Sequence, residues 1–327
     1  MTSTPKATET VSLAKVNLKV PRICFGLAPL GNMPDTYGYG VSEEEAHATV
    51  NAIFDSGFGF LDTSRNYGLG VSEQRIGDVI RARGGLPKGV IISSKLDRDF
   101  KDNHFDAKRA RESLEQSLKA LGVDRIQMLH LHDPEWASSL DGIVGKNGAL
   151  AELFKMKEEG LCDAVGLAAG RTDIMMPMLK DWDFDVLITH NRFTLANHHA
   201  EPMMDLAVSR KIAVLNAAPY ASGVLAKGSA NAPRVAYQLA SGEMLKPFER
   251  IEAVCAKYTI PPGAAALQFS MRDSRVASTI VGVSKPQRIQ QTLDWASFPI
   301  SDAAWAELMA LPFDTFDPEA TRDYKLG

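Results

Sequence analysis

The chain has 327 residues, of which 45% are hydrophobic and 23% are charged, as in ordinary globular proteins. Its net charge of −4, without a long basic or acidic run, excludes the electrostatic footprint that binding to nucleic acid or an anionic membrane requires. The three cysteines form no C-x-x-C pair and the first residues lack the apolar core of a signal peptide, so we expect a cytoplasmic protein without a disulfide framework or a metal site.

Short apolar segments rich in β-branched residues alternate with longer amphipathic segments along the whole chain. The short segments are predicted to be strands, and they comprise residues 22–27, 59–63, 90–95, 126–132, 162–168, 185–190, 213–218 and 278–283. The longer segments are predicted to be helices, with the clearest patterns over residues 43–56, 106–121, 150–159 and 246–257. Ser42, followed three residues later by Glu45, is typical of a capping box at the start of a helix.

Eight strands that alternate with helices indicate a parallel sheet joined by right-handed crossovers. A closed (β/α)8 TIM barrel accommodates this number without an exposed edge. A doubly wound open sheet would favour G-x-G-x-x-G after its first strand, and residues 26–31 (Gly-Leu-Ala-Pro-Leu-Gly) lack that pattern. We therefore predict a single barrel domain over residues 1–327. A hairpin over residues 9–20 is expected to close its bottom, residues 301–310 to form an extra helix, and the chain from Phe313 to be irregular.

Polar residues stand at the ends of three neighbouring predicted strands, where apolar residues would otherwise be expected. Asp62, Lys95 and His132 end the second, third and fourth strands, and Tyr67 follows Asp62 on the same loop. The carboxyl ends of barrel strands form the rim where such enzymes carry out their chemistry. We therefore expect these four side chains to meet in one site.

The four residue types suit hydride transfer to or from a carbonyl group. The developing oxyanion needs a proton donor, and an adjacent Lys95 would lower the pKa of Tyr67 toward the neutral range. Asp62 would hold the lysine in place, and His132 would hydrogen-bond the carbonyl oxygen. The same residues could also have purely structural roles. Asp62 and Lys95 could form an ion pair, Tyr67 could pack on the rim, and His132 could cap its strand.

The segment over residues 60–73 (Phe-Leu-Asp-Thr-Ser-Arg-Asn-Tyr-Gly-Leu-Gly-Val-Ser-Glu) resembles a signature of the aldo-keto reductase family, with its aspartate and tyrosine five residues apart. Residues 94–95 (Ser-Lys) and 131–134 (Leu-His-Asp-Pro) are similar to the family's lysine and histidine segments. The resemblance covers nearly the whole chain. It implies a nicotinamide-dependent oxidoreductase in which the four residues have the roles just described, with Tyr67 as general acid or base.

The resemblance also implies a set of residues that bind NAD or NADP after the fifth to eighth strands. They are Ala168, Asn191, Pro219, Gly223, Leu225, Gly282, Ser284, Lys285, Arg288 and Gln291. The family's usual contacts are altered where Ala168 replaces a serine and Ala217 an aromatic that stacks on nicotinamide. Lys285 and Arg288 would favour NADP, whereas Gly282 stands in place of a lysine that often binds the 2′-phosphate. The cofactor preference therefore stays open.

Several further segments are similar to the aldose 1-dehydrogenase branch of the family, which includes fucose- and pyridoxal-oxidising members. That similarity implies oxidation of an anomeric hydroxyl to a lactone, with Tyr67 as the base. Candidate residues for a sugar pocket are Tyr37, Asn103, Trp136 and Arg192, for which ordinary loop packing is an equal explanation. His130, two residues before His132, is expected to be a hydrogen-bonded core histidine.

Two alternative functions stay open from the sequence. The first is an NADPH-dependent reductase of aldehydes, ketones or keto-sugars. The second is a cofactor-binding regulatory subunit that resembles the potassium-channel β subunits, which share this barrel. In the enzyme readings the partner is a small-molecule substrate, and the protein is expected to be a monomer or a homodimer.

Overall fold

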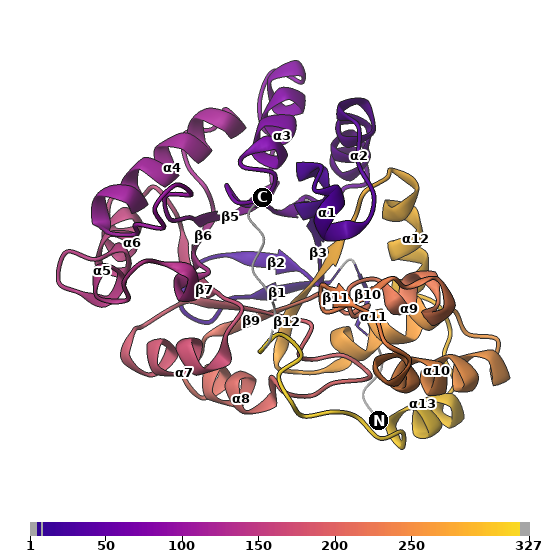
Figure 1. The fold of residues 1–327 in the computed structure, drawn as a ribbon. Coiled ribbons are helices and arrows are strands. Elements are labelled where there is room, and N and C mark those ends of the chain that lie inside the picture. The colour runs from indigo at the N-terminus through magenta and orange to yellow at the C-terminus, as the bar shows by residue number, and fades with distance from the viewer. Residues whose placement is uncertain (1–4, 8, 321–327) are drawn as a thin grey trace.

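The computed structural model describes residues 5–7 and 9–320, which fold around a closed barrel of parallel strands (Figure 1). Hydrogen bonds join the strands in the order β12-β3-β4-β5-β6-β7-β8-β9. The strands are β3 (Ile23–Gly26), β4 (Phe60–Asp62), β5 (Ile91–Leu96), β6 (Met128–His132), β7 (Ala164–Ala168), β8 (Val186–His190), β9 (Ala213–Ala217) and β12 (Val276–Gly282). Each predicted strand overlaps one of them, and the predicted barrel is confirmed.

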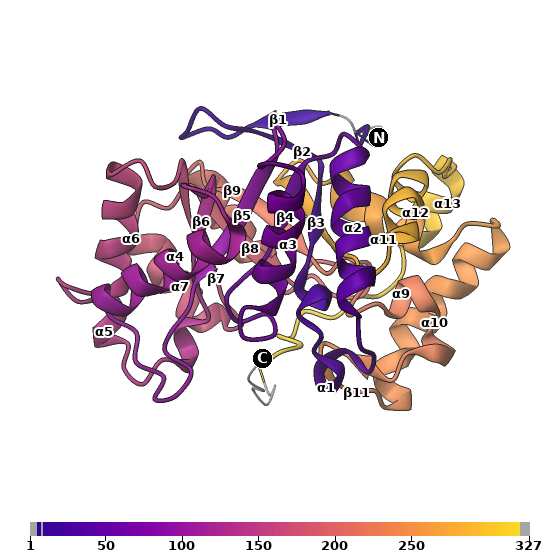
Figure 2. The same cartoon turned by 90° about the horizontal axis from the view of Figure 1, so that it is seen from above.

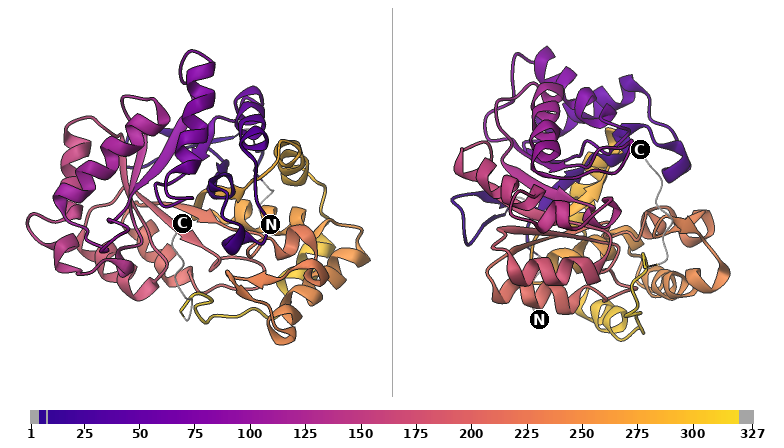
Figure 3. Two further views of the ribbon diagram at one scale, coloured as in Figure 1. Left: turned by 45° about the horizontal axis from the view of Figure 1, so that its top comes forward. Right: turned by 60° about the vertical axis from the view of Figure 1, so that its left-hand side comes forward.

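Helices surround the barrel in all views (Figures 1 and 3). They are α1 (Pro34–Tyr37), α2 (Glu43–Asp55), α3 (Val71–Ala82), α4 (Ala107–Leu121), α5 (Asp141–Val144), α6 (Ala149–Glu158), α7 (Thr172–Asp181), α8 (Glu201–Ser209), α9 (Val224–Lys227), α10 (Gly242–Lys257), α11 (Pro262–Arg272), α12 (Gln287–Ala296) and α13 (Asp302–Met309). The predicted cap is present, because the Ser42 hydroxyl accepts a hydrogen bond from the Glu45 N–H. Within residues 5–7 and 9–320, no helix has the length and apolarity needed to cross a membrane.

The predicted hairpin covers one end of the barrel. Strands β1 (Thr10–Ser12) and β2 (Lys19–Pro21) pair antiparallel and lie across the amino-terminal ends of the barrel strands (Figure 2). Leu13 and Val20 are buried in a cluster with Cys24 and Phe60 from the barrel itself. Because this cluster fills the bottom, a ligand reaches the barrel from the opposite end.

The chain after α13 folds back onto the connection between β8 and α8. The backbone N–H of His198 donates to the carbonyl of Asp314 (2.8 Å), and the side-chain amide of Asn197 donates to the carbonyl of Phe316 (3.0 Å). The rings of His198 and Phe313 stack with centroids 3.7 Å apart. Residues 313–320, which we call the tail, are irregular as predicted and are held by these contacts at the carboxyl end of the barrel.

A close approach of two helices explains one buried glycine. A Cβ atom added at Gly77 in α3 would lie 1.9 Å from the backbone carbonyl oxygen of Ala120 in α4. We expect Gly77→Ala to lower the free energy of unfolding by about 3 kcal/mol, at the upper end for overpacking, because backbone must move. Urea denaturation measures the change. Gly242→Ala, where an added Cβ meets nothing within 4 Å, is the control, and equal stability of the two variants would contradict the explanation.

Candidate active site

An aspartate, a lysine and a tyrosine form one hydrogen-bonded group at the carboxyl end of the barrel. Asp62 ends β4, and Lys95 lies in the neighbouring strand β5. The Lys95 ammonium donates to both carboxylate oxygens of Asp62 (2.8 and 3.0 Å) and to the carbonyl of Thr63 (2.7 Å). It also donates to the hydroxyl of Tyr67, 3.1 Å away. The structure therefore brings together three of the four predicted residues through a single nitrogen.

The protonation of Tyr67 differs from the sequence-based expectation. Burial of the phenol, followed by the negative charge of Asp62, raises the pKa of Tyr67 well above its usual value near 10. The prediction that Lys95 lowers this pKa was wrong. The main physical reason is the burial of the phenol, which disfavours its charged form. The carboxylate of Asp62, which holds the Lys95 ammonium through two oxygens, adds to this effect. Tyr67 is therefore a neutral phenol at physiological pH and is ready to donate a proton.

His132 ends β6 and is bound to a second, unpredicted carboxylate. Its Nδ1 lies 2.6 Å from Oδ1 of Asp97, the residue after β5. The other Asp97 oxygen accepts from the Ser64 hydroxyl (2.7 Å) and from the backbone N–H of Asn66 (3.0 Å). The rings of His132 and Tyr67 meet edge to face with centroids 6.0 Å apart. The fourth predicted residue thus joins the same site.

A layer of buried polar groups lies beneath this site. The Ser93 hydroxyl donates to Oδ1 of Asp62 (2.8 Å) and lies 3.1 Å from Nε2 of His130. Because the serine has a single proton, His130 donates from Nε2. Burial lowers the pKa of His130 well below its usual value, so the ring is neutral. His130 is the hydrogen-bonded core histidine that the sequence predicts.

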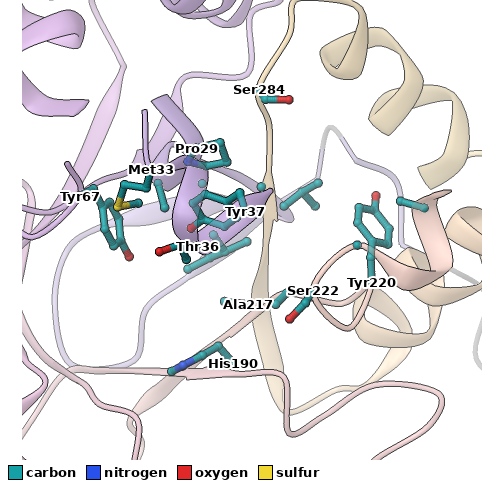
Figure 4. Close-up of a pocket in the computed structure, with 18 of the residues that line it drawn as sticks. Pro29, Met33, Thr36, Tyr37, Tyr67, His190, Ala217, Tyr220, Ser222 and Ser284 are labelled. Carbon is teal, nitrogen blue, oxygen red and sulfur yellow. The ribbon is translucent and has the colours of Figure 1, made fainter. Parts of the chain in front are cut away.

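A cavity of about 590 Å³ connects these residues with the carboxyl ends of β9 and β12. Tyr67, Lys95 and His132 line one end, and Ser284 and Arg288 line the other. Figure 4 shows Tyr67 and Ser284 on different sides of this cavity, with Tyr37 nearer its centre and Ala217 below them in this view. Tyr220 also lines it, and its ring meets the edge of Trp295 in α12. The cavity is elongated and combines a site for proton transfer with a distant polar end.

Most of the residues predicted to bind the cofactor line this cavity. They are Ala168, Gly223, Gly282, Ser284, Lys285, Arg288 and Gln291. Pro219, Leu225 and Asn191 are not among the lining residues, and Leu225 and Asn191 are buried. Ala168 and Ala217 line the cavity at positions where the family resemblance implies larger side chains.

Asn191 is engaged by the tail in a way that the sequence did not indicate. Its amide donates to Oε1 of Glu319 (2.8 Å), and its oxygen accepts from the Ser222 hydroxyl (3.3 Å). The other Glu319 oxygen lies 3.0 Å from Nε2 of His190, which lines the cavity. The tail therefore fixes the orientation of Asn191 and His190 beside the cavity.

The residues predicted for a sugar pocket are placed in different surroundings. Tyr37 lines the cavity, whereas Asn103, Trp136 and Arg192 are not among its lining residues. Asn103 accepts a hydrogen bond from Arg98 (2.8 Å) in the loop after β5. Arg192 is fully buried and donates to Asp317 of the tail (2.7 Å), so it anchors the tail. The structure instead places Tyr237 and His190 along the cavity wall.

The distant end of the cavity is rich in positive charge. Lys227 lies over the ring of Tyr39, 4.7 Å from its centroid, and burial together with Arg288 lowers the pKa of this lysine. Lys285 is 3.8 Å from a carboxylate oxygen of Glu45. Within the described part of the chain, neither Lys227 nor Arg288 pairs with a carboxylate. Two cations crowded at a cavity wall suit an anionic group such as the diphosphate of a dinucleotide.

Comparison with known proteins agrees with this arrangement. A model of the Aldo/keto reductase family matches residues 22–311. The chain is 29% identical to D-threo-aldose 1-dehydrogenase from Pseudomonas sp. over 90% of this chain and 95% of that protein. It is 26% identical to pyridoxal 4-dehydrogenase from Microbacterium luteolum over 93% of this chain and 97% of that protein. An aldo-keto reductase structure from Bacillus halodurans, in its holo form, shares the fold with a TM-score of 0.76 at 18% identity, over 97% of this chain and 100% of that one.

Proposed function

Because the chain belongs to the aldo/keto reductase family, we propose that it oxidises the anomeric hydroxyl of an aldose to a lactone. The chain is an NAD(P)-dependent oxidoreductase. The observation that carries the proposed reaction is the meeting of Tyr67, Lys95 and His132 at one end of an elongated cavity with a basic far end. The aldose is supported by the likeness to D-threo-aldose 1-dehydrogenase over 90% of the chain.

The proposed mechanism assigns one task to each side chain. The dinucleotide supplies a hydride acceptor when bound. Tyr67 and His132 hold the oxygen of the reacting hydroxyl between them. The minor phenolate form of Tyr67, whose charge the Lys95 ammonium at 3.1 Å compensates, accepts the proton of that hydroxyl as the hydride leaves. Lys95 and Asp62 hold the Tyr67 hydroxyl in place through the contacts at 3.1 and 2.8 Å. In the opposite direction the neutral Tyr67 phenol donates the proton to the carbonyl oxygen.

The far end of the cavity fits the remainder of the dinucleotide. Lys227 and Arg288 would hold the diphosphate by charge, and Ser284 with the start of α12 would bind a phosphate or ribose. Ala168 and Ala217 would face the nicotinamide end. Asn191 lies behind this part of the wall with its amide bound to Glu319 and Ser222, so it would support the wall through these contacts.

A substrate screen tests the proposed function. NAD and NADP are each offered with a panel of aldoses, pyridoxal and small alcohols, and reduction is followed at the nicotinamide absorbance. We expect the fastest turnover with an aldose. Turnover confined to carbonyl reduction with NADPH would instead support a general reductase, and dinucleotide binding without turnover on any substrate would support a regulatory subunit.

We further propose NAD as the preferred cofactor, because an acidic residue lines the end of the cavity where the adenosine would bind. Glu45 lines the cavity close to Lys285 and opposes the charge that would otherwise attract a 2′-phosphate. Glu45→Gln is expected to raise the affinity for NADPH relative to NADH roughly twofold to fivefold, as a partly exposed charge contributes about 0.2–1 kcal/mol. Fluorescence titration with both dinucleotides measures the ratio. Glu44→Gln, on the exposed side of α2, is the control, and an unchanged ratio in Glu45→Gln would contradict the assignment.

We also propose that the enzyme works in the cytoplasm on a small-molecule substrate as a monomer or a homodimer. Size-exclusion chromatography with light scattering measures its assembly state.

A further inference from the structure

A buried carboxylate beside the catalytic group has no part in the reaction described so far. Asp97 is fully buried at the end of β5, two residues after Lys95. Its two oxygens accept from His132, Ser64 and the backbone of Asn66, at 2.6 to 3.0 Å. A buried carboxylate is costly unless its partners compensate it, so its retention at this place calls for an explanation.

Helix α4 holds Asp97 rigidly from the other side. The backbone N–H of Asp97 donates to the Ser113 hydroxyl (3.0 Å), and its carbonyl accepts from the Arg109 guanidinium (3.1 Å). With the backbone fixed by α4 and one carboxylate oxygen fixed by Ser64 (2.7 Å), the remaining oxygen is presented to the histidine ring. In this geometry the Asp97 carboxylate lies behind the imidazole of His132 and fixes the orientation of the ring.

We propose that Asp97 is a positioning residue of the reaction, which fixes the ring of His132 and keeps it positively charged so that its Nε2–H faces the reacting oxygen. That this oxygen is the reacting hydroxyl of an aldose rests on the proposed function. With Nδ1 bound to Asp97, Nε2 is the ring nitrogen left for the cavity, which His132 lines. The nearest carboxylate to Nε2 is Oδ1 of Asp133, which at 3.7 Å is beyond hydrogen-bond distance.

The charges around His132 favour its protonated form. Burial of the ring opposes a charge, but Asp133 and Asp97 together raise the pKa of His132 above its usual value, against the smaller effect of Lys95. Tyr67 from the β4 loop and His130 from β6 face the ring as neutral groups. Burial raises the pKa of Glu135 to about 8, so this neighbour is largely neutral as well. Two carboxylates therefore act on His132 from β5 and β6.

A charged His132 gives the two groups at the reacting oxygen different tasks. The phenol of Tyr67 exchanges the proton, and the imidazolium stabilises negative charge that develops on the oxygen during hydride transfer. A merely structural Asp97 would hold the β4 loop through Ser64 and Asn66 without affecting the charge of His132. The ionisation of His132 must therefore be measured as well as turnover.

The test compares Asp97→Asn with Asp99→Asn, a change of equal charge in the loop after β5. NMR of the imidazole nitrogens follows the titration of His132 in both variants and in the unchanged protein. In Asp97→Asn we expect the His132 titration to move to lower pH by about one unit, because a neighbouring negative charge is lost. We expect kcat to fall about ten- to a hundredfold with KM little changed. Asp99→Asn should match the unchanged protein in both measurements.

The dependence of kcat on pH shows in which direction the loss of Asp97 shifts the ionisation of His132. A raised pKa means that the charged form of His132 is present below that pKa and is lost as the pH rises through it. The alkaline limb of kcat should therefore move to lower pH in Asp97→Asn. Asp97→Glu, which keeps the charge, should regain part of the lost kcat.

An unchanged His132 titration in Asp97→Asn would overturn the proposal, and so would an alkaline limb of the kcat profile that does not move. Should that variant fail to fold, the proposal would be overturned by a His132 in the unchanged protein that titrates at or below its usual pKa near 6.5. NADH titration of the same samples separates this outcome from a failure of the proposed function. A protein that binds no dinucleotide would contradict the proposed function, while the His132 titration would still decide the role of Asp97.

Discussion

Tyr67→Phe is expected to lower kcat about a thousandfold, within the range for loss of a general acid or base. The substitution removes a single hydroxyl, which accepts from Lys95 at 3.1 Å, and keeps the ring that meets His132 edge to face. The affinity for the dinucleotide should stay unchanged, because the Lys227 and Arg288 end of the cavity is untouched. Steady-state kinetics and fluorescence titration measure the two quantities.

Tyr258→Phe is the matched control for this experiment. Its hydroxyl bonds to Glu307 on the surface, outside the cavity, and its loss should leave turnover as it was. If Tyr67→Phe kept a tenth or more of the original kcat, Tyr67 would not be the proton-exchanging group. His132 would then be the remaining candidate at the same oxygen.

Lys95→Met is expected to abolish turnover and also to lower the free energy of unfolding by about 3–5 kcal/mol, because it leaves a buried carboxylate without its cation. The exposed fractions of the Lys95 and Asp62 side chains are 2% and 6%, so water replaces the lost partner poorly. The remaining side-chain contact of Asp62 in this group would be the Ser93 hydroxyl at 2.8 Å. Urea denaturation measures the stability.

The double variant Asp62→Leu with Lys95→Met separates stability from catalysis. Replacement of both charges by apolar groups of similar size should restore most of the lost stability, since neither charge is then left unpaired. Turnover should stay absent, because the Tyr67 hydroxyl has lost the group that holds it. A double variant as unstable as the single one would show that the ion pair itself stabilises the fold.

The barrel could be predicted because its signals are local and repeated. Segments of β-branched residues recur between amphipathic segments, and each predicted strand lies within a few residues of an observed one. Helices α3 and α11 lack such signals, because α3 begins without a side-chain cap and α11 is buried on nearly all sides and so has no polar face. The two short strands β10 (Arg234–Val235) and β11 (Gln238–Leu239) form a small hairpin in the loop between α9 and α10 that no pattern indicated.

The site was predictable only where its residues stand at strand ends. Asp62, Lys95 and His132 interrupt apolar strands, and this conflict with burial is the signal. Asp97 carries the same signal in weaker form, since side chains alternate along a strand and Asp97 follows Lys95 by two residues. Glu319 and Lys227 give no such signal, because they come from irregular or short segments whose place depends on the complete fold.

The position of the tail also sets the order in which the site is completed during synthesis. A ribosome delivers the chain from its amino end, and the tail emerges after β12 has become available to close the barrel against β3. Until Glu319 arrives, Asn191 and His190 lack the carboxylate that orients them. A nascent barrel therefore already contains Asp62, Lys95 and Tyr67, but it acquires the carboxylate that orients His190 only once Glu319 has left the ribosome.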